Sequence, residues 1–148
     1  MINRDNIIEM LQTGKKDFSR LYLADLDLSN LNLDGCNFTR TNLTLVDLSG
    51  ASLSYANFSN SNLSNANFTN TRLNYICSVD VDFTWATMRY ANLKEISFNN
   101  ANFYGADLSN ANLNKANISN ANLTHTNLRS ANLTDTNLNN ATLNNTKF

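Results

Sequence analysis

The stretch FSNSNLSNANFTNTRLNYICSVDVDFTW, residues 58–85, decides the fold because a large apolar side chain falls at nearly every fifth position. The positions in this series are Phe58, Leu63, Phe68, Leu73, Ser78 and Phe83. Ser78 is the one polar member, and the spacing resumes after it without a shift. A period of five matches neither the 3.6 of a helix nor the 2 of a strand. The chain must therefore turn once every five residues.

The same spacing continues from Phe18 to Phe148, which gives 27 positions that we call centres. Sixteen centres are Leu, eight are Phe, and the others are Met88, Ile118 and Ser78. The residue two before each centre is mostly small and is Ala in twelve units. Because residues two apart in an extended segment face the same way, both side chains are expected to point inward.

The two residues after each centre are expected to form a corner. The second corner residue is Asn, Gly or Asp at 15 of 26 positions, and these types most easily adopt left-handed backbone conformations. A chain that turns this regularly and keeps one large and one small side chain inward winds into a solenoid. Its coils pair with the coils above and below.

The units approximate the pattern A-N-L-[ST]-N, as in Ala-Asn-Leu-Asn-Lys at residues 111–115 and Ala-Asn-Leu-Thr-Asp at residues 131–135. This pattern strongly resembles the pentapeptide-repeat family. The resemblance covers residues 16–148. It implies an all-β solenoid, a right-handed quadrilateral parallel β-helix with four units per coil. At about 4.8 Å between paired strands, a rod of about 6.5 coils is about 31 Å long.

Residues 1–14 are predicted to form a short capping helix, and residues 15–148 the coils of the same single domain. Asn3 or Asp5 can cap the start of this helix, and Gly14 can end it. Three leucines of the first coil replace the small residues of later coils: Leu21, Leu26 and Leu31. We therefore expect the helix to lie across this end and to shield the exposed edges.

The repeat continues to Phe148, so the last coil is a candidate docking end. Its apolar residues are Leu138, Leu143 and Phe148. Tail-to-tail dimers occur in the family that the chain resembles, which implies a homodimer through this coil.

Ser78 interrupts a column of phenylalanines if centres are sorted by twenty. One interpretation is that the hydroxyl bonds to a backbone carbonyl, while Ile76 and Val81, which stand where other units have small residues, replace the lost volume. The alternative is a local bulge that redirects nearby surface residues.

Departures from the repeat concentrate in residues 72–104 and lie at outward or corner positions. The candidate partner-binding residues are Arg72, Tyr75, Trp85, Arg89, Tyr90, Lys94 and Tyr104. Arg, Tyr and Trp are enriched at binding hot spots, so this mid-rod belt is the predicted contact surface for a protein partner.

Composition excludes several classes of function. The formal net charge is −1 with both signs interspersed, so no direct nucleic-acid binding is expected. No apolar stretch is long enough to span a membrane or open a secretion signal, which favours the cytoplasm. Cys36 and Cys77 stand alone as reduced thiols, so neither a metal nor another cofactor is expected.

Catalysis is not expected either. His125 is the single histidine and occupies a corner position, and no nucleophile with an adjacent base can be identified. We also expect a packed rod to have no cleft. The sequence therefore predicts a non-enzymatic structural or protein-interaction module.

Two alternatives remain open. Some members of the family imitate DNA and occupy type II topoisomerases such as gyrase, but a 31 Å DNA mimic would need on the order of 18 negative charges. An ice-binding plane is the second alternative, although its threonine row is interrupted by Tyr104.

Overall fold

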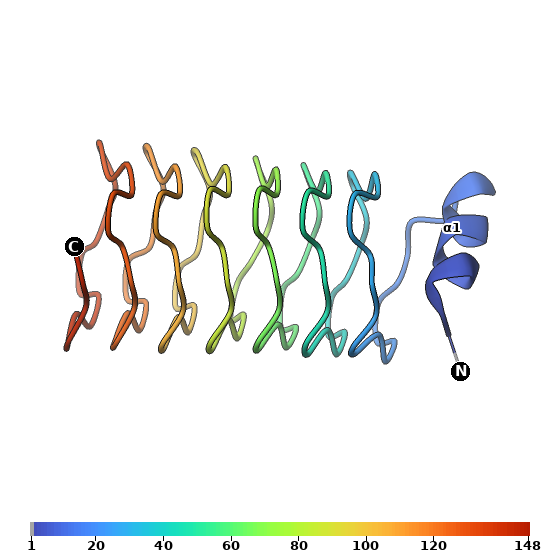
Figure 1. The fold of residues 1–148 in the computed structure, drawn as a ribbon, viewed down its shortest axis with the longest axis horizontal. Helices are drawn as coiled ribbons and strands as arrows, with labels where there is room; N and C mark the ends of the chain where they lie inside the picture. Colours follow the sequence, from blue (N-terminus) through green and yellow to red (C-terminus); the bar gives the residue numbers. More distant parts are fainter. Residues whose placement is uncertain (1) are drawn as a thin grey trace.

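The computed structural model describes residues 2–148, which form one helix and a rod of stacked coils (Figure 1). Helix α1 spans Arg4–Gln12, and the rest of the described chain contains no other helix. The first and last coils lie at opposite ends of the rod, and α1 covers the N-terminal end (Figure 1).

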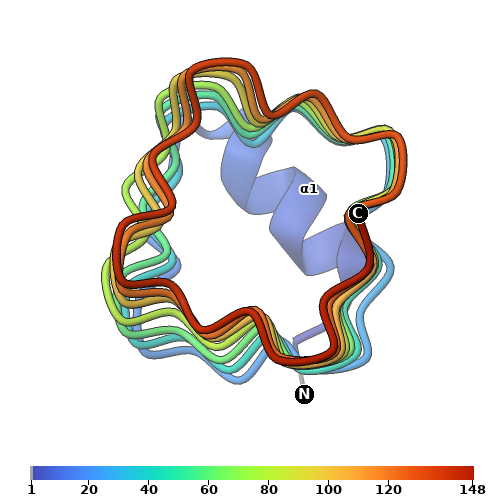
Figure 2. The same ribbon diagram turned by 90° about the vertical axis from the view of Figure 1, so that its left-hand side faces the viewer.

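Each coil contains twenty residues. Parallel β-bridges join every fifth residue to the residue twenty positions later, from Asp17↔Asn37 to Asn127↔Lys147. Four five-residue units therefore complete one turn, as predicted. Seen along the rod, the coils superpose as a four-sided ring (Figure 2).

The four sides are named by their centres. Side A carries the centres at 18, 38, 58, 78, 98, 118 and 138, side B those at 23 to 143, side C those at 28 to 148, and side D those at 33 to 133, each in steps of twenty. Corners AB, BC, CD and DA follow sides A, B, C and D. Every side is a three-residue extended segment, so residues 2–148 contain isolated bridges and no strand of several consecutive paired residues.

Every corner depends on a left-handed residue at its second position. All 26 of these residues have φ between +52° and +69°, although only Gly35, Gly50 and Gly105 are glycines. Most corners are closed by a turn hydrogen bond, such as that from Cys36 N–H to the Leu33 carbonyl at 3.1 Å. Asn is favoured there because its short polar side chain tolerates this conformation.

The centres form the core. From Phe18 to Leu128 they are all buried, including Ser78. On side A, Phe38 stacks on Phe18 at 5.5 Å and on Phe58 at 5.1 Å between ring centroids. Burial of each such side chain contributes on the order of 1.5–3 kcal/mol, so the centres dominate the specification of the fold.

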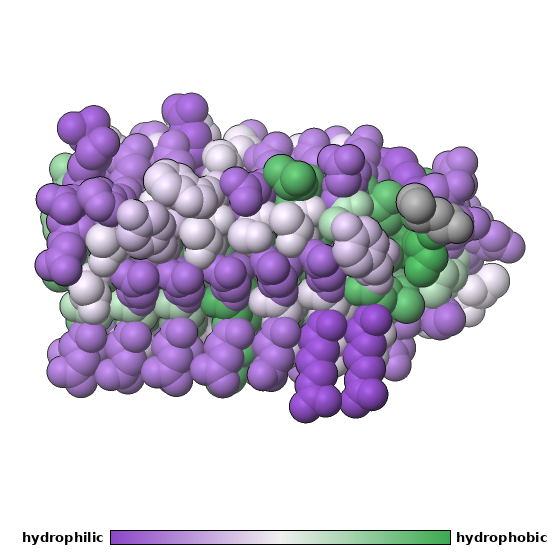
Figure 3. Space-filling model, turned by 90° about the horizontal axis from the view of Figure 1, so that it is seen from below, coloured by the Kyte–Doolittle hydropathy of each residue, from purple (hydrophilic) through white to green (hydrophobic). Residues whose placement is uncertain are grey.

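Asparagines before the centres support the coils from outside. The Asn42 Oδ1 accepts a bond from the Thr44 N–H at 3.0 Å, which fixes the corner. Between coils, the Asn122 amide donates to Asn102 Oδ1 at 3.0 Å. Figure 3 shows the resulting rows of polar side chains running along one face of the rod. The abundance of asparagine is therefore explained by structure.

Helix α1 begins with a capping box. The Asn3 side chain accepts from Asn6 N–H at 2.9 Å, and the Asn6 side chain accepts from Asn3 N–H at 3.1 Å. This confirms the prediction of Asn3 as the cap. Gly14, at φ +80°, follows the end of the helix and donates to the Leu11 carbonyl.

Two kinds of contact hold α1 across the first coil. Ile7 of the helix is fully buried in the core. Three leucines were predicted to lie under the helix, and they are partly buried and pack against the same core cluster: Leu21, Leu26 and Leu31. Arg4 also donates to the carbonyls of Asp27 and Ser29 at 2.6 and 2.9 Å and forms an ion pair with the Asp27 carboxylate at 2.8 Å. The prediction that the helix caps this end is confirmed.

The interior of side A changes at Ser78. Its Oγ donates to the Ser97 carbonyl at 2.7 Å, which confirms the predicted hydroxyl-to-backbone bond. Ile76 and Val81 are buried where other units have small residues. The bridges Cys77↔Ser97 and Asp82↔Asn102 keep the register of twenty. No extra residue is inserted, so the alternative of a bulge is wrong.

The backbone ladder is nevertheless interrupted beside Ser78. On side A the N–H of Phe58 donates to the Cys77 carbonyl at 2.8 Å, and that of Phe98 donates to Asn117 at 2.7 Å. Within residues 2–148, the equivalent bonds from the N–H groups of Ser78, Asp80 and Ser97 are absent. The Ser78 hydroxyl thus donates to the Ser97 carbonyl, which in the regular ladder would accept a bond from the Ser78 N–H.

Candidate functional site

The structure divides the seven predicted contact residues between two surfaces. Five of them lie on side D or on its two corners, and we call them the side D cluster: Arg72, Tyr75, Arg89, Tyr90 and Lys94. The other two, Trp85 and Tyr104, lie on corner BC, beyond side C. The residues therefore do not form one continuous flat surface.

The side D cluster combines aromatic and basic side chains. Arg72 points outward from the middle of side D, bridged to Ser52 and Asn92 in the adjacent coils. At corner CD, the Arg89 guanidinium lies 5.7 Å from the centre of the Tyr90 ring. This distance permits a cation–π contact, which holds both side chains in one place.

Charge pairing within the cluster is partial. Arg89 Nε lies 3.9 Å from Asp107 Oδ2, and Lys94 Nζ lies 3.6 Å from Glu95 Oε1. Both pairs are exposed, so each contributes little to stability. Arg72 has no ion pair within residues 2–148. The cluster therefore presents a net positive charge to solvent.

Corner DA adds a second tyrosine to this surface. The ring of Tyr75 stacks on that of Tyr55, one coil before it, with centroids 5.3 Å apart and planes 15° apart. More than half of each side chain remains exposed. Tyr55 was visible in the sequence as the residue twenty positions before Tyr75, although it lies outside residues 72–104.

Corner BC carries the remaining aromatic residues. Trp85 and Tyr104 meet edge to face at 5.6 Å, and Tyr104 meets His125 in the same manner at 5.4 Å. His125 was considered only as an isolated surface residue. The coil register places it two coils above Trp85, and this relation could have been obtained from the twenty-residue offset.

The structure places the predicted docking end on the final coil. Leu138 is partly buried, whereas Leu143 is 40% exposed and Phe148 is 62% exposed. The centres of this coil thus expose apolar surface, whereas the centres of earlier coils are buried.

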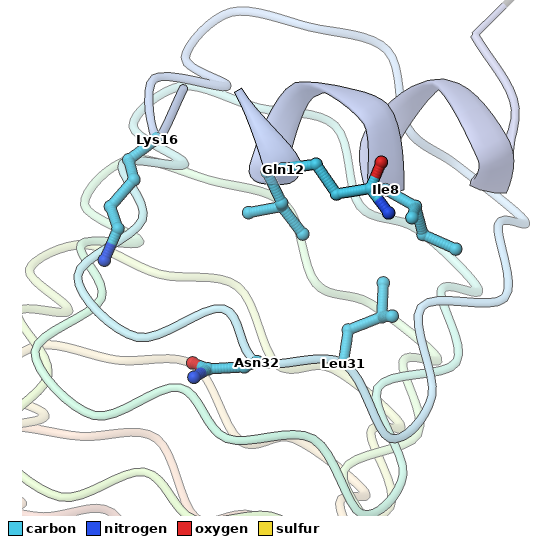
Figure 4. Close-up of a pocket in the computed structure, with 6 residues that line it drawn as sticks. Ile8, Gln12, Lys16, Leu31 and Asn32 are labelled. Atoms are coloured by element: carbon cyan, nitrogen blue, oxygen red, sulfur yellow. The ribbon is translucent and has the colours of Figure 1, made fainter. Parts of the chain in front are cut away.

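The expectation that the rod has no cleft is wrong at the helix end. A cavity of about 370 Å³ lies between α1 and the first coil, lined by Ile8, Leu11, Gln12, Lys16, Leu31 and Asn32. Figure 4 shows Ile8 and Gln12 on α1 facing Leu31 and Asn32 of the first coil across this cavity. The lining contains no acid, cysteine or histidine, so it offers no acid–base pair.

The two thiols differ in exposure. Cys36 is buried, and burial raises the pKa of its thiol to about 11, so the reactive thiolate is not populated at neutral pH. Cys77 is exposed on side A, with its Sγ 3.3 Å from Ser59 Oγ. The two residues are both free thiols, as predicted.

Across residues 2–148, no three His, Cys, Asp or Glu side chains are grouped so that they could hold a metal ion. No helix in that range is long and apolar enough to cross a membrane.

Comparison with known proteins identifies the family. The pentapeptide-repeat signature matches residues 17–54, 41–75, 79–114 and 111–148, in eight copies. The chain belongs to the pentapeptide-repeat family, and its coils of four five-residue units form the right-handed quadrilateral β-helix of that family. No curated protein sequence matches it.

Several solved structures are similar to this chain. A trypsin-treated form of QnrB1, a plasmid-mediated fluoroquinolone resistance protein, is 19% identical, with a TM-score of 0.46 over 85% of this chain and 72% of that one. HetL from Nostoc sp. strain PCC 7120, involved in heterocyst differentiation regulation, is 24% identical, with a TM-score of 0.30 over 99% and 95%. Rfr23 from Cyanothece 51142 is also 24% identical, with a TM-score of 0.34 over 97% and 98%.

Proposed function

We propose that this chain is a non-enzymatic protein-interaction module that acts in the cytoplasm. The side D cluster is its main contact surface, and the partner surface that fits it is acidic. The supporting observation is that large side chains occupy corner positions whose backbone disfavours them. Tyr75 and Tyr90 have φ of +60° and +59°, where most units have Asn, Gly or Asp.

This placement has a cost that the fold does not require. A non-glycine residue in the left-handed region loses on the order of 1 kcal/mol, and Asn reduces this penalty through its short polar side chain. Tyr75 and Tyr90 are each 54% exposed, so little burial offsets the loss. We therefore expect the Tyr75 and Tyr90 side chains to contact another molecule.

Affinity purification with the full chain tests the proposal. The double variant Arg89→Ala/Tyr90→Ala should lose a partner that the wild type retains. Tyr22→Ala is the matched control, because Tyr22 is 70% exposed on side B, away from the cluster. Binding should also weaken as salt concentration rises, since the contact involves exposed charges. Equal recovery by the wild type and the double variant would contradict the proposal.

We further propose that the final coil, through Leu143 and Phe148, docks a second copy of the chain. Its unpaired backbone edge and exposed apolar centres fit the same edge of another molecule. Sedimentation velocity of the wild type should show a dimer that dissociates on the change Leu143→Asp. A wild type that stays monomeric at high concentration would contradict this arrangement.

DNA mimicry receives less support from the surface. The outward row of side C contains Asp27, Asp47 and Asp107, but Arg4 pairs with the first and Arg89 lies near the third. Lys147 ends the same row. A topoisomerase supercoiling assay that showed inhibition at stoichiometric protein would restore this alternative.

A further inference from the structure

Corner BC has a feature that the interaction proposal does not use. Trp85, the only tryptophan in the chain, packs over Gly105 in the next coil. A Cβ atom at Gly105 would lie 2.4, 2.5 and 2.8 Å from Trp85 Cε3, Cζ3 and Cδ2. These are three consecutive atoms of the six-membered ring. Their near-equal distances place the Cβ position above the face of the ring and not at its edge.

The indole therefore lies flat against the rod. The inner face of the indole rests on the backbone of Gly105. This contact requires glycine, because any side chain at position 105 would clash with the ring. Trp85 is still 56% exposed, so its outer face is open to solvent. Tyr104 supports the ring from its edge, and His125 extends the aromatic surface by another coil. We call Trp85, Tyr104, Gly105 and His125 the corner BC platform.

The surroundings of the platform are polar, and corner BC carries no Asp, Glu, Lys or Arg between residues 64 and 125. The neighbouring corner residues are Ser64, Asn65, Thr84 and Thr124. Two carboxylates flank the corner, and both are hydrogen-bonded. Asp82 on side B accepts bonds from Thr84 and Asn102, and Asp107 on side C accepts bonds from Ser109 and Asn127. Amide and hydroxyl groups therefore border the open face of the indole.

We propose that the corner BC platform binds a neutral saccharide. A pyranose ring has one face of C–H groups, which can lie on the electron-rich face of an indole, and a rim of hydroxyls, which can exchange hydrogen bonds with amides and hydroxyls. An acidic or basic partner would find no opposite charge at this corner. A proline-rich peptide also stacks on aromatic rings, but it offers few donors to the surrounding polar groups.

The single tryptophan makes a direct test available. The full chain is titrated with neutral hexasaccharides of glucose, N-acetylglucosamine and xylose, and with decaproline, while tryptophan fluorescence is recorded. At least one saccharide should give a saturable blue shift, with half-saturation on the order of 1 mM as for a small exposed site. Decaproline should leave the spectrum unchanged. No response to any saccharide, or a response to decaproline alone, would overturn the proposal.

A pair of glycine variants separates the platform from general stability. Gly105→Ala would place a Cβ atom against the Trp85 ring and displace the indole. Gly35→Ala introduces the same backbone strain, because φ is +69° at Gly35 and +68° at Gly105. Its Cβ atom would contact only Lys16 Nζ, at 3.6 Å. Gly105→Ala should weaken saccharide binding about tenfold or more, and Gly35→Ala should change it less than twofold. Circular dichroism verifies that both variants are folded. Equal affinities for the two folded variants would contradict the assigned geometry.

The saccharide site is independent of the proposed protein contact. Arg89→Ala/Tyr90→Ala, which removes the side D cluster contact, should keep the fluorescence response to saccharide. Loss of saccharide binding in that variant would show that the two surfaces are not separate and would count against the corner BC platform.

Discussion

Two steps of side A, from Phe38 to Phe58 and from Ser78 to Phe98, differ although both keep the twenty-residue register. At the step from Phe38 to Phe58, the rings stack at 5.1 Å and the backbone ladder is complete. At the step from Ser78 to Phe98, a hydroxyl takes the Ser97 carbonyl and three backbone N–H groups lose their usual bonds. The inter-coil hydrogen bonding thus depends on what fills the interior, whereas the twenty-residue register is the same at both steps.

The largest effect on stability is expected at the step from Phe38 to Phe58. Phe58→Ala removes a ring that stacks on Phe38 and meets Phe68 edge to face at 6.3 Å. Truncation of a buried phenylalanine should lower the free energy of unfolding by about 3–5 kcal/mol. Denaturant unfolding measures this loss. Phe148→Ala, at a 62% exposed centre, is the control and should change stability far less.

The second largest effect on stability is expected at the step from Ser78 to Phe98. Ser78→Phe restores the column in sequence but inserts a ring where Ile76 and Val81 already occupy the interior. Overpacking should lower the free energy of unfolding by about 1–3 kcal/mol. The added change Ile76→Ala should recover part of this loss. If Ser78→Phe alone raised stability, the interpretation that its neighbours fill the missing volume would be wrong.

The sequence was sufficient to predict the repeat, the corners and the cap because each depends on local residue types. The position of a surface residue was harder to predict. Arg72 and Trp85 are close in sequence, yet they point from different parts of the rod, because thirteen residues are more than half of a twenty-residue coil. Once four sides are assumed, residue numbers sorted by twenty give these positions directly.

Two features could not be predicted from the repeat. The cavity beside Leu31 depends on the angle at which α1 rests on the first coil, and the five-residue period carries no information about that angle. The missing bond from the Ser78 N–H to the Ser97 carbonyl depends on a competition between the Ser78 hydroxyl and the Ser78 amide for one carbonyl. Local residue preferences do not decide such a competition.

Hydrogen exchange compares the two steps at the level of single amides. The N–H groups of Ser78 and Asp80 lack the inter-coil bonds that the N–H groups of Phe38 and Arg40 make at 2.7 and 3.1 Å. They should exchange about tenfold faster, which corresponds to about 1.4 kcal/mol less protection. Nuclear magnetic resonance at constant pH measures each amide. Equal protection at both steps would show that the ladder closes in solution.

The smallest effect extends the comparison from the interior to the corners. Tyr75→Asn replaces an exposed aromatic residue at φ +60° with the type that tolerates this backbone. Relief of strain should raise the free energy of unfolding by about 0.5–1 kcal/mol, reduced by loss of the stack on Tyr55. Tyr90→Asn is the matched variant, because Tyr90 has almost the same φ and would lose only the exposed cation–π contact with Arg89 at 5.7 Å, which is worth less than an aromatic stack. It should therefore gain more than Tyr75→Asn. A loss of stability in both variants would mean that these tyrosines serve the fold, and the argument that they are retained for a partner would no longer hold.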